Sequence, residues 1–132
     1  MRRFLIDTNV YSHAQRGDED VLRALQRMDE ISVSSISIGE LFAGFRRGRR
    51  DLENRQELAR FLDAPRVSIC GIDVNTAGFY AEVLHALRQA GTPIPTNDIW
   101  IAAVSFRHGL PLYTLDQHFQ LVPGLSLMPE SL

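Results

Sequence analysis

Phe4-Leu5-Ile6-Asp7-Thr8-Asn9, near the start of the chain, is a short apolar run that gives way at once to an acidic turn. Residues 3–6 predict a buried strand, and Asp7 opens a helix that runs to about Gln15 and stops before Gly17. The same change from an apolar run to a polar turn occurs at three more places. The acids at those places are Glu40, Asp98 and Asp116.

Strands and helices alternate along the chain. Further strands are predicted at 31–34, 66–70, 112–114 and 125–128, helices at about 18–28, 36–47, 51–63, 74–90 and 97–108, and a single helical turn at 116–119. This alternation predicts an α/β fold, namely a three-layer α/β/α sandwich with a mostly parallel central sheet. The chain shows no repeat, linker or low-complexity segment, so residues 1–132 are expected to form one domain.

In such a fold, acids that follow parallel strands can gather at one edge of the sheet. Clustered carboxylates repel one another unless a cation lies among them, and hard divalent cations prefer oxygen ligands. The pattern therefore suggests a metal-dependent active site built from these acids: Asp7, Glu40, Asp98 and Asp116.

Each acid also has a purely structural interpretation. Glu40 lies three residues after Ser37, which matches a capping box at a helix start. The three aspartates of the set lie at helix starts, where Asp is a preferred N-cap or is favoured by the helix dipole. Asp73 likewise follows a strand and precedes a helix, so position alone does not separate it from the four.

The composition narrows the function classes. The formal net charge is −2, so any polyanionic partner must be held by a local basic patch or by metal. All 14 basic residues are Arg, which excludes a P-loop and Schiff-base chemistry, since both need Lys. The single cysteine, Cys70, lies in an apolar run and is expected to be a buried hydrophobe. No apolar stretch has the length of a signal peptide core or a membrane span, so we expect a cytoplasmic protein without membrane attachment.

Four motifs in order resemble those of PIN-domain ribonucleases, especially the VapC toxins of type II toxin–antitoxin pairs. They are Ile6-Asp7-Thr8-Asn9-Val10, residues 35–44 (SISIGELFAG), residues 94–103 (IPTNDIWIAA), and Thr114-Leu115-Asp116 followed by Phe119 and Val122-Pro123-Gly124-Leu125. The match runs nearly from end to end, and all four acids are present.

The resemblance implies that the four acids hold Mg²⁺ or Mn²⁺, with Asp7 and Asp98 as the most direct ligands. Glu40 and Asp116 would shape the site, orient water or bind a second ion. Thr114 would lie beside them as a hydroxyl donor, although a plain strand threonine remains an alternative. Asp73 is assigned a structural role, and capping or turn chemistry is preferred for Thr8 and Asn9.

The resemblance further implies an endoribonuclease that hydrolyses RNA phosphodiester bonds with a carboxylate-held metal and an activated water. It also implies a VapB-type antitoxin that silences the enzyme, and a homodimer. Arg46, Arg47, Arg49 and Arg50 are candidates for RNA contact, with a solvated helix end as the alternative.

Several smaller assignments stay open. Trp100 is expected in the core rather than stacked on a base, and Leu41, Phe42 and Phe45 line either a groove or the core. The four histidines show no ligand spacing and are expected at surfaces or helix ends. The competing function is a catalytically silent PIN-fold module that binds a protein partner. A dehalogenase-type phosphatase or a receiver domain is disfavoured, because both require a Lys.

Overall fold

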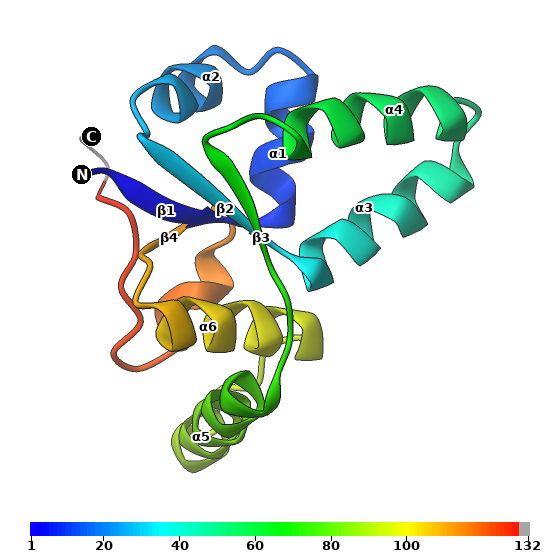
Figure 1. Ribbon diagram of the computed structural model, residues 1–132. Coiled ribbons are helices and arrows are strands. Elements are labelled where there is room, and N and C mark those ends of the chain that lie inside the picture. Colours follow the sequence, from blue (N-terminus) through cyan, green and yellow to red (C-terminus); the bar gives the residue numbers. More distant parts are fainter. Residues whose placement is uncertain (130–132) are drawn as a thin grey trace.

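The structure is a computed structural model that describes residues 1–129. Its strands form one parallel sheet in the order β3-β2-β1-β4, with bounds β1 (Arg3–Ile6), β2 (Glu30–Ser34), β3 (Val67–Cys70) and β4 (Leu112–Tyr113). The helices are α1 (Thr8–Gln15), α2 (Glu19–Gln26), α3 (Ser35–Arg47), α4 (Asp51–Leu62), α5 (Val74–Ala90), α6 (Thr96–His108) and the short 3₁₀ helix η1 (Gln117–Leu121). The expected α/β/α sandwich is therefore confirmed (Figure 1).

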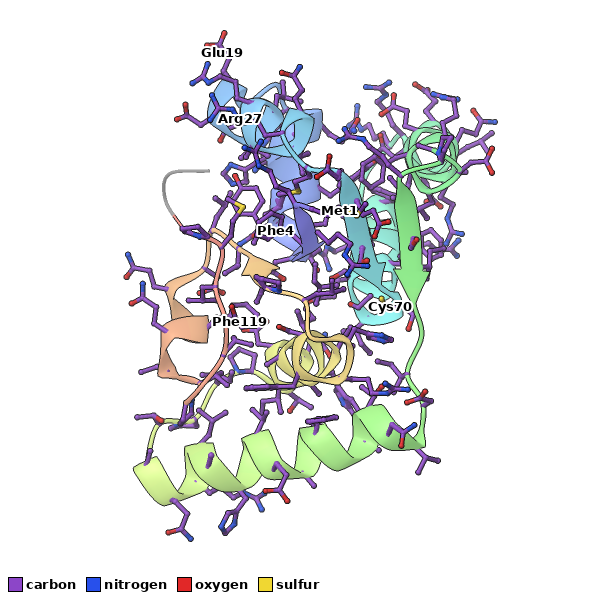
Figure 2. All side chains as sticks on the ribbon, turned by 60° about the vertical axis from the view of Figure 1, so that its left-hand side comes forward. Met1, Phe4, Glu19, Arg27, Cys70 and Phe119 are labelled. Atoms are coloured by element: carbon purple, nitrogen blue, oxygen red, sulfur yellow. The ribbon has the colours of Figure 1, made fainter. Side chains whose placement is uncertain are left out.

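Two hydrophobic clusters cover the two faces of the sheet. Helices α1 to α4 pack on one face and α5 and α6 on the other (Figure 1). The central strand β1 serves both clusters, because Phe4 and Ile6 point to the first and Leu5 to the second. Cys70, at the end of β3, is a free and buried thiol, and burial raises its pKa (Figure 2).

Local chemistry explains where the helices begin and end. Asp18 and Asp73 cap α2 and α5 by accepting backbone N–H groups of the first turn. Gly91 and Gly109 end α5 and α6 with positive φ angles of 68° and 62°, which side chains with a Cβ rarely adopt. None of the helices within residues 1–129 combines the length and hydropathy needed to cross a bilayer.

The order of the strands creates a crevice at one edge of the sheet. The chain moves outward from β1 to β2 and β3, then returns through α5 and α6 to place β4 on the other side of β1. The connections on the two sides of β1 cover opposite faces of the sheet. A crevice therefore opens between the carboxyl ends of β1 and β4, where the strand order reverses. Asp7 and Thr114 are the first residues after these two strands.

The C-terminal strand predicted at 125–128 is wrong. Only an isolated bridge between Leu112 and Leu127 forms, flanked by the N–H of Leu112 donating to Ser126 O and the N–H of Met128 donating to Leu112 O. The segment cannot extend this pairing because β4 has only two residues. Strand β4 is one residue shorter than predicted, and Thr114, which follows it, donates its hydroxyl to the side chain of Asp7.

The 3₁₀ helix η1 is anchored by a single large side chain. Phe119 is fully buried in the second cluster (labelled in Figure 2), whereas Leu121 on the same turn is 42% exposed. We predict that Phe119→Ala lowers the free energy of unfolding by about 3–5 kcal/mol through lost burial and a cavity. Leu121→Ala, the matched control, is expected to cost less than about 1 kcal/mol. Urea denaturation measures both, and equal losses for the two variants would contradict this assignment.

Candidate active site

Asp7 lies at the centre of the crevice, directly after β1. Its carboxylate is buried, with Oδ1 accepting the N–H of Thr8 at 2.8 Å and Oδ2 accepting the Thr114 hydroxyl at 2.7 Å. Asp7 is thus both the N-cap of α1 and a carboxylate facing the other acids. The capping interpretation was correct for this residue, but it does not exclude a place in the acidic site.

Glu40 reaches the crevice from the second turn of α3. Its Oε1 accepts the Thr8 hydroxyl at 2.6 Å and its Oε2 accepts Asn97 Nδ2 at 3.4 Å. The capping-box interpretation is wrong, because Ser34 is the N-cap and its hydroxyl accepts the N–H of Ser37 at 3.1 Å. Glu40 therefore lies inside the helix and points its carboxylate at the site.

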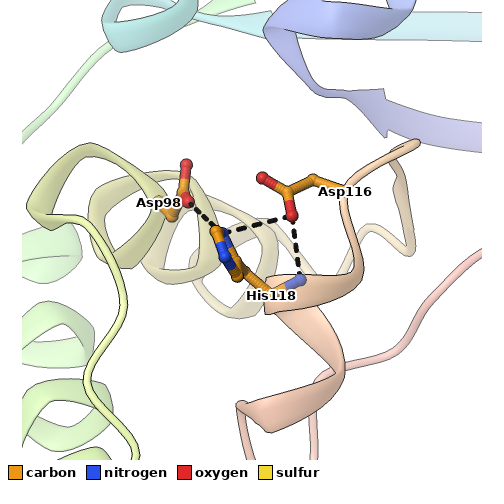
Figure 3. Close-up of side chains that lie close together, drawn as sticks. All are labelled: Asp98, Asp116 and His118. Atoms are coloured by element: carbon orange, nitrogen blue, oxygen red, sulfur yellow. Dashed lines mark hydrogen bonds and ion pairs between the residues drawn. The ribbon is translucent and has the colours of Figure 1, made fainter.

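Asp98 and Asp116 face each other across the mouth of the crevice (Figure 3). Asp98 stands in the first turn of α6, and 14% of its side chain is exposed. Asp116 caps η1, since its Oδ1 accepts the N–H of His118 at 2.9 Å, and its own N–H donates to the Thr114 hydroxyl at 3.0 Å. The Thr114 hydroxyl therefore links Asp116 to Asp7, because it also donates to the Asp7 carboxylate.

His118 completes this group, although its sequence position predicted nothing of the kind. Its Nδ1 lies 3.2 Å from Asp116 Oδ1 and 3.8 Å from Asp98 Oδ2 (Figure 3). His118 is exposed, as expected for the histidines, but its closeness to two aspartates was not anticipated from the sequence. The only signal in the sequence was its place two residues after Asp116, on the same turn.

These side chains surround an open pocket of about 400 Å³. Its walls come from the start of α6, from α3 and from η1, and its polar lining is Glu40, Thr96, Asn97, Asp98, Asp116 and His118. Asp7 lies buried behind this wall. The pocket is shallow enough to admit an extended polymer rather than to enclose a small ligand.

The electrostatics of the pocket favour a cation. Burial, together with the neighbouring charges of Asp7, Asp116 and Glu40, raises the pKa of Asp98 to about 6, although His118 lowers it. Burial also raises the pKa of Asp7, against the hydrogen bonds from Thr114 and Thr8. Carboxylates that resist ionisation in this way are stabilised by a hard divalent ion, so the donor set fits such an ion.

Other predicted residues lie apart from the acids. Asp73 accepts both the N–H and the hydroxyl of Thr76, caps α5 and lies 3.9 Å from Arg107, as its structural assignment required. The ring of Trp100 stacks on Tyr80 with 4.0 Å between centroids. Asn9 accepts the N–H of Leu115 at 3.4 Å and so supports the loop before Asp116.

The basic cluster occupies the far end of α3 and the turn into α4. Arg46 and Arg47 form the last turn of α3, Arg49 follows Gly48, and Arg50 pairs with Glu53. One guanidinium nitrogen of Arg47 lies 4.0 Å from the position that a Cβ on Gly44 would take. Arg47 therefore folds back along α3 toward the turn that carries Glu40.

A pH-dependent stability follows from the raised pKa of Asp98. A carboxyl group that is harder to ionise in the folded state costs stability above its folded pKa, and the cost disappears below the unfolded value near 4. In metal-free protein we predict that Asp98→Asn raises the free energy of unfolding at pH 7.5 by about 1–2 kcal/mol. The gain should shrink toward zero at pH 4.5.

Denaturant unfolding of both proteins in the presence of a chelator measures the difference. Asp73→Asn is the matched control, because Asn keeps the helix cap and the carboxylate lost there faces none of the four acids. A gain for Asp98→Asn that is equal at pH 7.5 and pH 4.5 would mean that the ionisation of Asp98 is not its cause.

The chain matches known proteins over nearly its whole length. The model of the PIN domain family matches residues 4–125. Ribonuclease VapC4 of Mycobacterium tuberculosis is 30% identical over 130 residues, covering 97% of each chain. The crystal structure of VapBC2 from Rickettsia felis, bound to a DNA fragment from its promoter, contains a chain that is 26% identical with a TM-score of 0.85, covering 96% of this chain and 97% of that one. Together with the geometry of the acids, these matches show that the chain belongs to the PIN domain family.

Proposed function

We propose that this protein is a metal-dependent endoribonuclease and the toxin of a type II toxin–antitoxin pair, active in the cytoplasm as a single PIN domain over residues 1–132. The observation that carries the proposal is the closeness of four acids: Glu40, Asp98 and Asp116 line one pocket, and the buried Asp7 interacts with all three, so that burial and repulsion raise the pKa of Asp7 and Asp98. The names of similar proteins, a ribonuclease and VapBC complexes, support the same function.

Asp7 and Asp98 would hold Mg²⁺ or Mn²⁺, with Glu40 and Asp116 shaping the same site or holding a second ion. A bound divalent ion supplies polarisation of the scissile phosphate and activation of a water molecule. Thr114 keeps one oxygen of Asp7 in place through its hydroxyl, and Thr8 and Asn97 do the same for Glu40. Both carboxylates are therefore oriented before any substrate arrives.

The proposed roles predict that Asp7→Asn and Asp98→Asn each lower cleavage of single-stranded RNA by at least about a hundredfold, because each removes a charge needed to hold the ion. Asp73→Asn, which retains its helix cap, should cleave normally. Cleavage is measured with a fluorescent RNA in Mn²⁺, with circular dichroism as the test of folding. Folded Asp98→Asn protein that cleaves within a few-fold of wild type would remove Asp98 from the site.

RNA would cross the pocket and continue along α3. Glu40, Gly44 and Arg47 share one face of that helix at helical spacing, and Gly44 leaves the backbone bare between them. Arg47 is thus the member of the basic cluster best placed for a phosphate next to the scissile bond, whereas Arg50 is engaged by Glu53. Arg46 and Arg49 would add weaker contacts farther along.

Salt dependence separates a phosphate contact from a solvated helix end. We predict that Arg47→Ala lowers the slope of log K against log salt by about one for RNA binding, whereas Arg88→Ala on α5 leaves it unchanged. Binding is followed by fluorescence anisotropy on the inactive Asp98→Asn background. Identical slopes for the two variants would mean that Arg47 is exposed to solvent and contacts no phosphate of the RNA.

A VapB-type antitoxin and a second copy of the chain are the proposed partners. An antitoxin tail would lie in a groove of about 190 Å³ between α1, α3 and α4, which is lined by Tyr11, Phe45 and five polar or charged side chains. Leu41 is buried in the core, and Phe42 and Phe45 pack against it, with Phe42 also 4.0 Å from the guanidinium of Arg55. A catalytically silent binding module is the alternative. It would bind the antitoxin but cleave no RNA at any Mn²⁺ concentration.

A further inference from the structure

His118 is held against the acidic pocket by the packing of its neighbour. Phe119 is fully buried, which fixes η1 on the second cluster, and the N–H of His118 donates to Asp116 at 2.9 Å. The imidazole itself is 55% exposed and packs into no core. Its position over the pocket mouth is therefore set by the backbone of η1, and its ring remains available to a ligand.

The distances around the ring match those between ligands of one ion. Nδ1 lies 3.2 Å from Asp116 Oδ1 and 3.8 Å from Asp98 Oδ2, and each of the three residues offers one donor atom within 4.8 Å of those of the other two. Ligands about 2.1 Å from an octahedral ion are separated by about 3 Å when adjacent and about 4 Å when opposite. One ion placed between them would thus lie near both aspartates and the imidazole.

On the basis of the proposed function, we propose that Asp116 contributes directly to the divalent ion held by Asp98, and that His118 is a nitrogen ligand of that same ion. Nδ1 faces the carboxylates and provides the lone pair, while the exposed side of the ring leaves the Nε2 proton to water. The site then has mixed nitrogen and oxygen donors rather than carboxylates alone.

A nitrogen ligand changes which metal the pocket prefers. Carboxylate and water suit Mg²⁺ and Mn²⁺ alike, whereas imidazole adds affinity for transition metals and little for Mg²⁺. His118 therefore biases the pocket toward Mn²⁺. The pocket of the His118→Gln variant, which keeps a polar side chain without the ring nitrogen, should lose that preference.

Pulsed electron paramagnetic resonance of bound Mn²⁺ tests the assignment directly. Wild-type protein carrying ¹⁵N only in histidine should show a directly coordinated ¹⁵N nucleus on the Mn²⁺ ion. The signal should disappear in His118→Gln and remain in His85→Gln, a variant of an exposed histidine on α5. By calorimetry, His118→Gln should weaken Mn²⁺ binding about tenfold and Mg²⁺ binding less than threefold.

The outcomes separate this inference from the proposed function. Bound Mn²⁺ without any histidine coupling would overturn the ligand role of His118 and leave the nuclease proposal standing, with the imidazole as an ion-pair partner of the aspartates. Equal weakening of Mn²⁺ and Mg²⁺ binding in His118→Gln would overturn the metal preference. Absence of Mn²⁺ binding in the wild type would overturn both proposals.

Discussion

The burial and mutual repulsion of clustered carboxylates form the constraint on which this structure depends. Asp7 and Asp98 are far apart in the sequence, yet the charge of Asp7 raises the pKa of Asp98, and the charges of Glu40 and Asp116 raise the pKa of Asp7. Such an arrangement lowers the free energy of unfolding at neutral pH. It persists because the packing of the rest of the domain holds these side chains in place. A cation bound among the carboxylates neutralises their charges and removes this repulsion. The relief of the repulsion therefore adds to the affinity for the ion.

Paired strands, a threonine side chain and two helices hold the four acids in place. Strand β1 is paired on both sides, and its carboxyl end delivers Asp7 to the place where the strand order reverses. The Thr114 hydroxyl donates to Asp7 and accepts from the backbone of Asp116, so a single side chain joins two of the acids. Helices α3 and α6 bring the remaining two, and the contact from Asn97 to Glu40 joins those helices at the site.

Much of this arrangement could be predicted from the sequence, because apolar runs, glycine stops and aspartate caps are local signals. The helix and strand bounds agree within a few residues, except for the last strand, where pairing depended on the length of β4. The role of Glu40 was ambiguous because its spacing from Ser37 also matched a capping box. The structure decides against the capping box, since α3 starts at Ser35 with Ser34 as its N-cap. His118 could not be predicted, since its closeness to Asp98 depends on where Phe119 anchors η1.

The most direct measurement is an anomalous difference map from crystals soaked in Mn²⁺. The central claim is that the repelling carboxylates exist to hold a divalent ion. It predicts a strong peak within bonding distance of Asp98 and of at least one of the other two aspartates, Asp7 and Asp116. Crystals of Asp98→Asn should show no peak there. A well-ordered map without density among these side chains, or with the ion bound only elsewhere on the molecule, would contradict it.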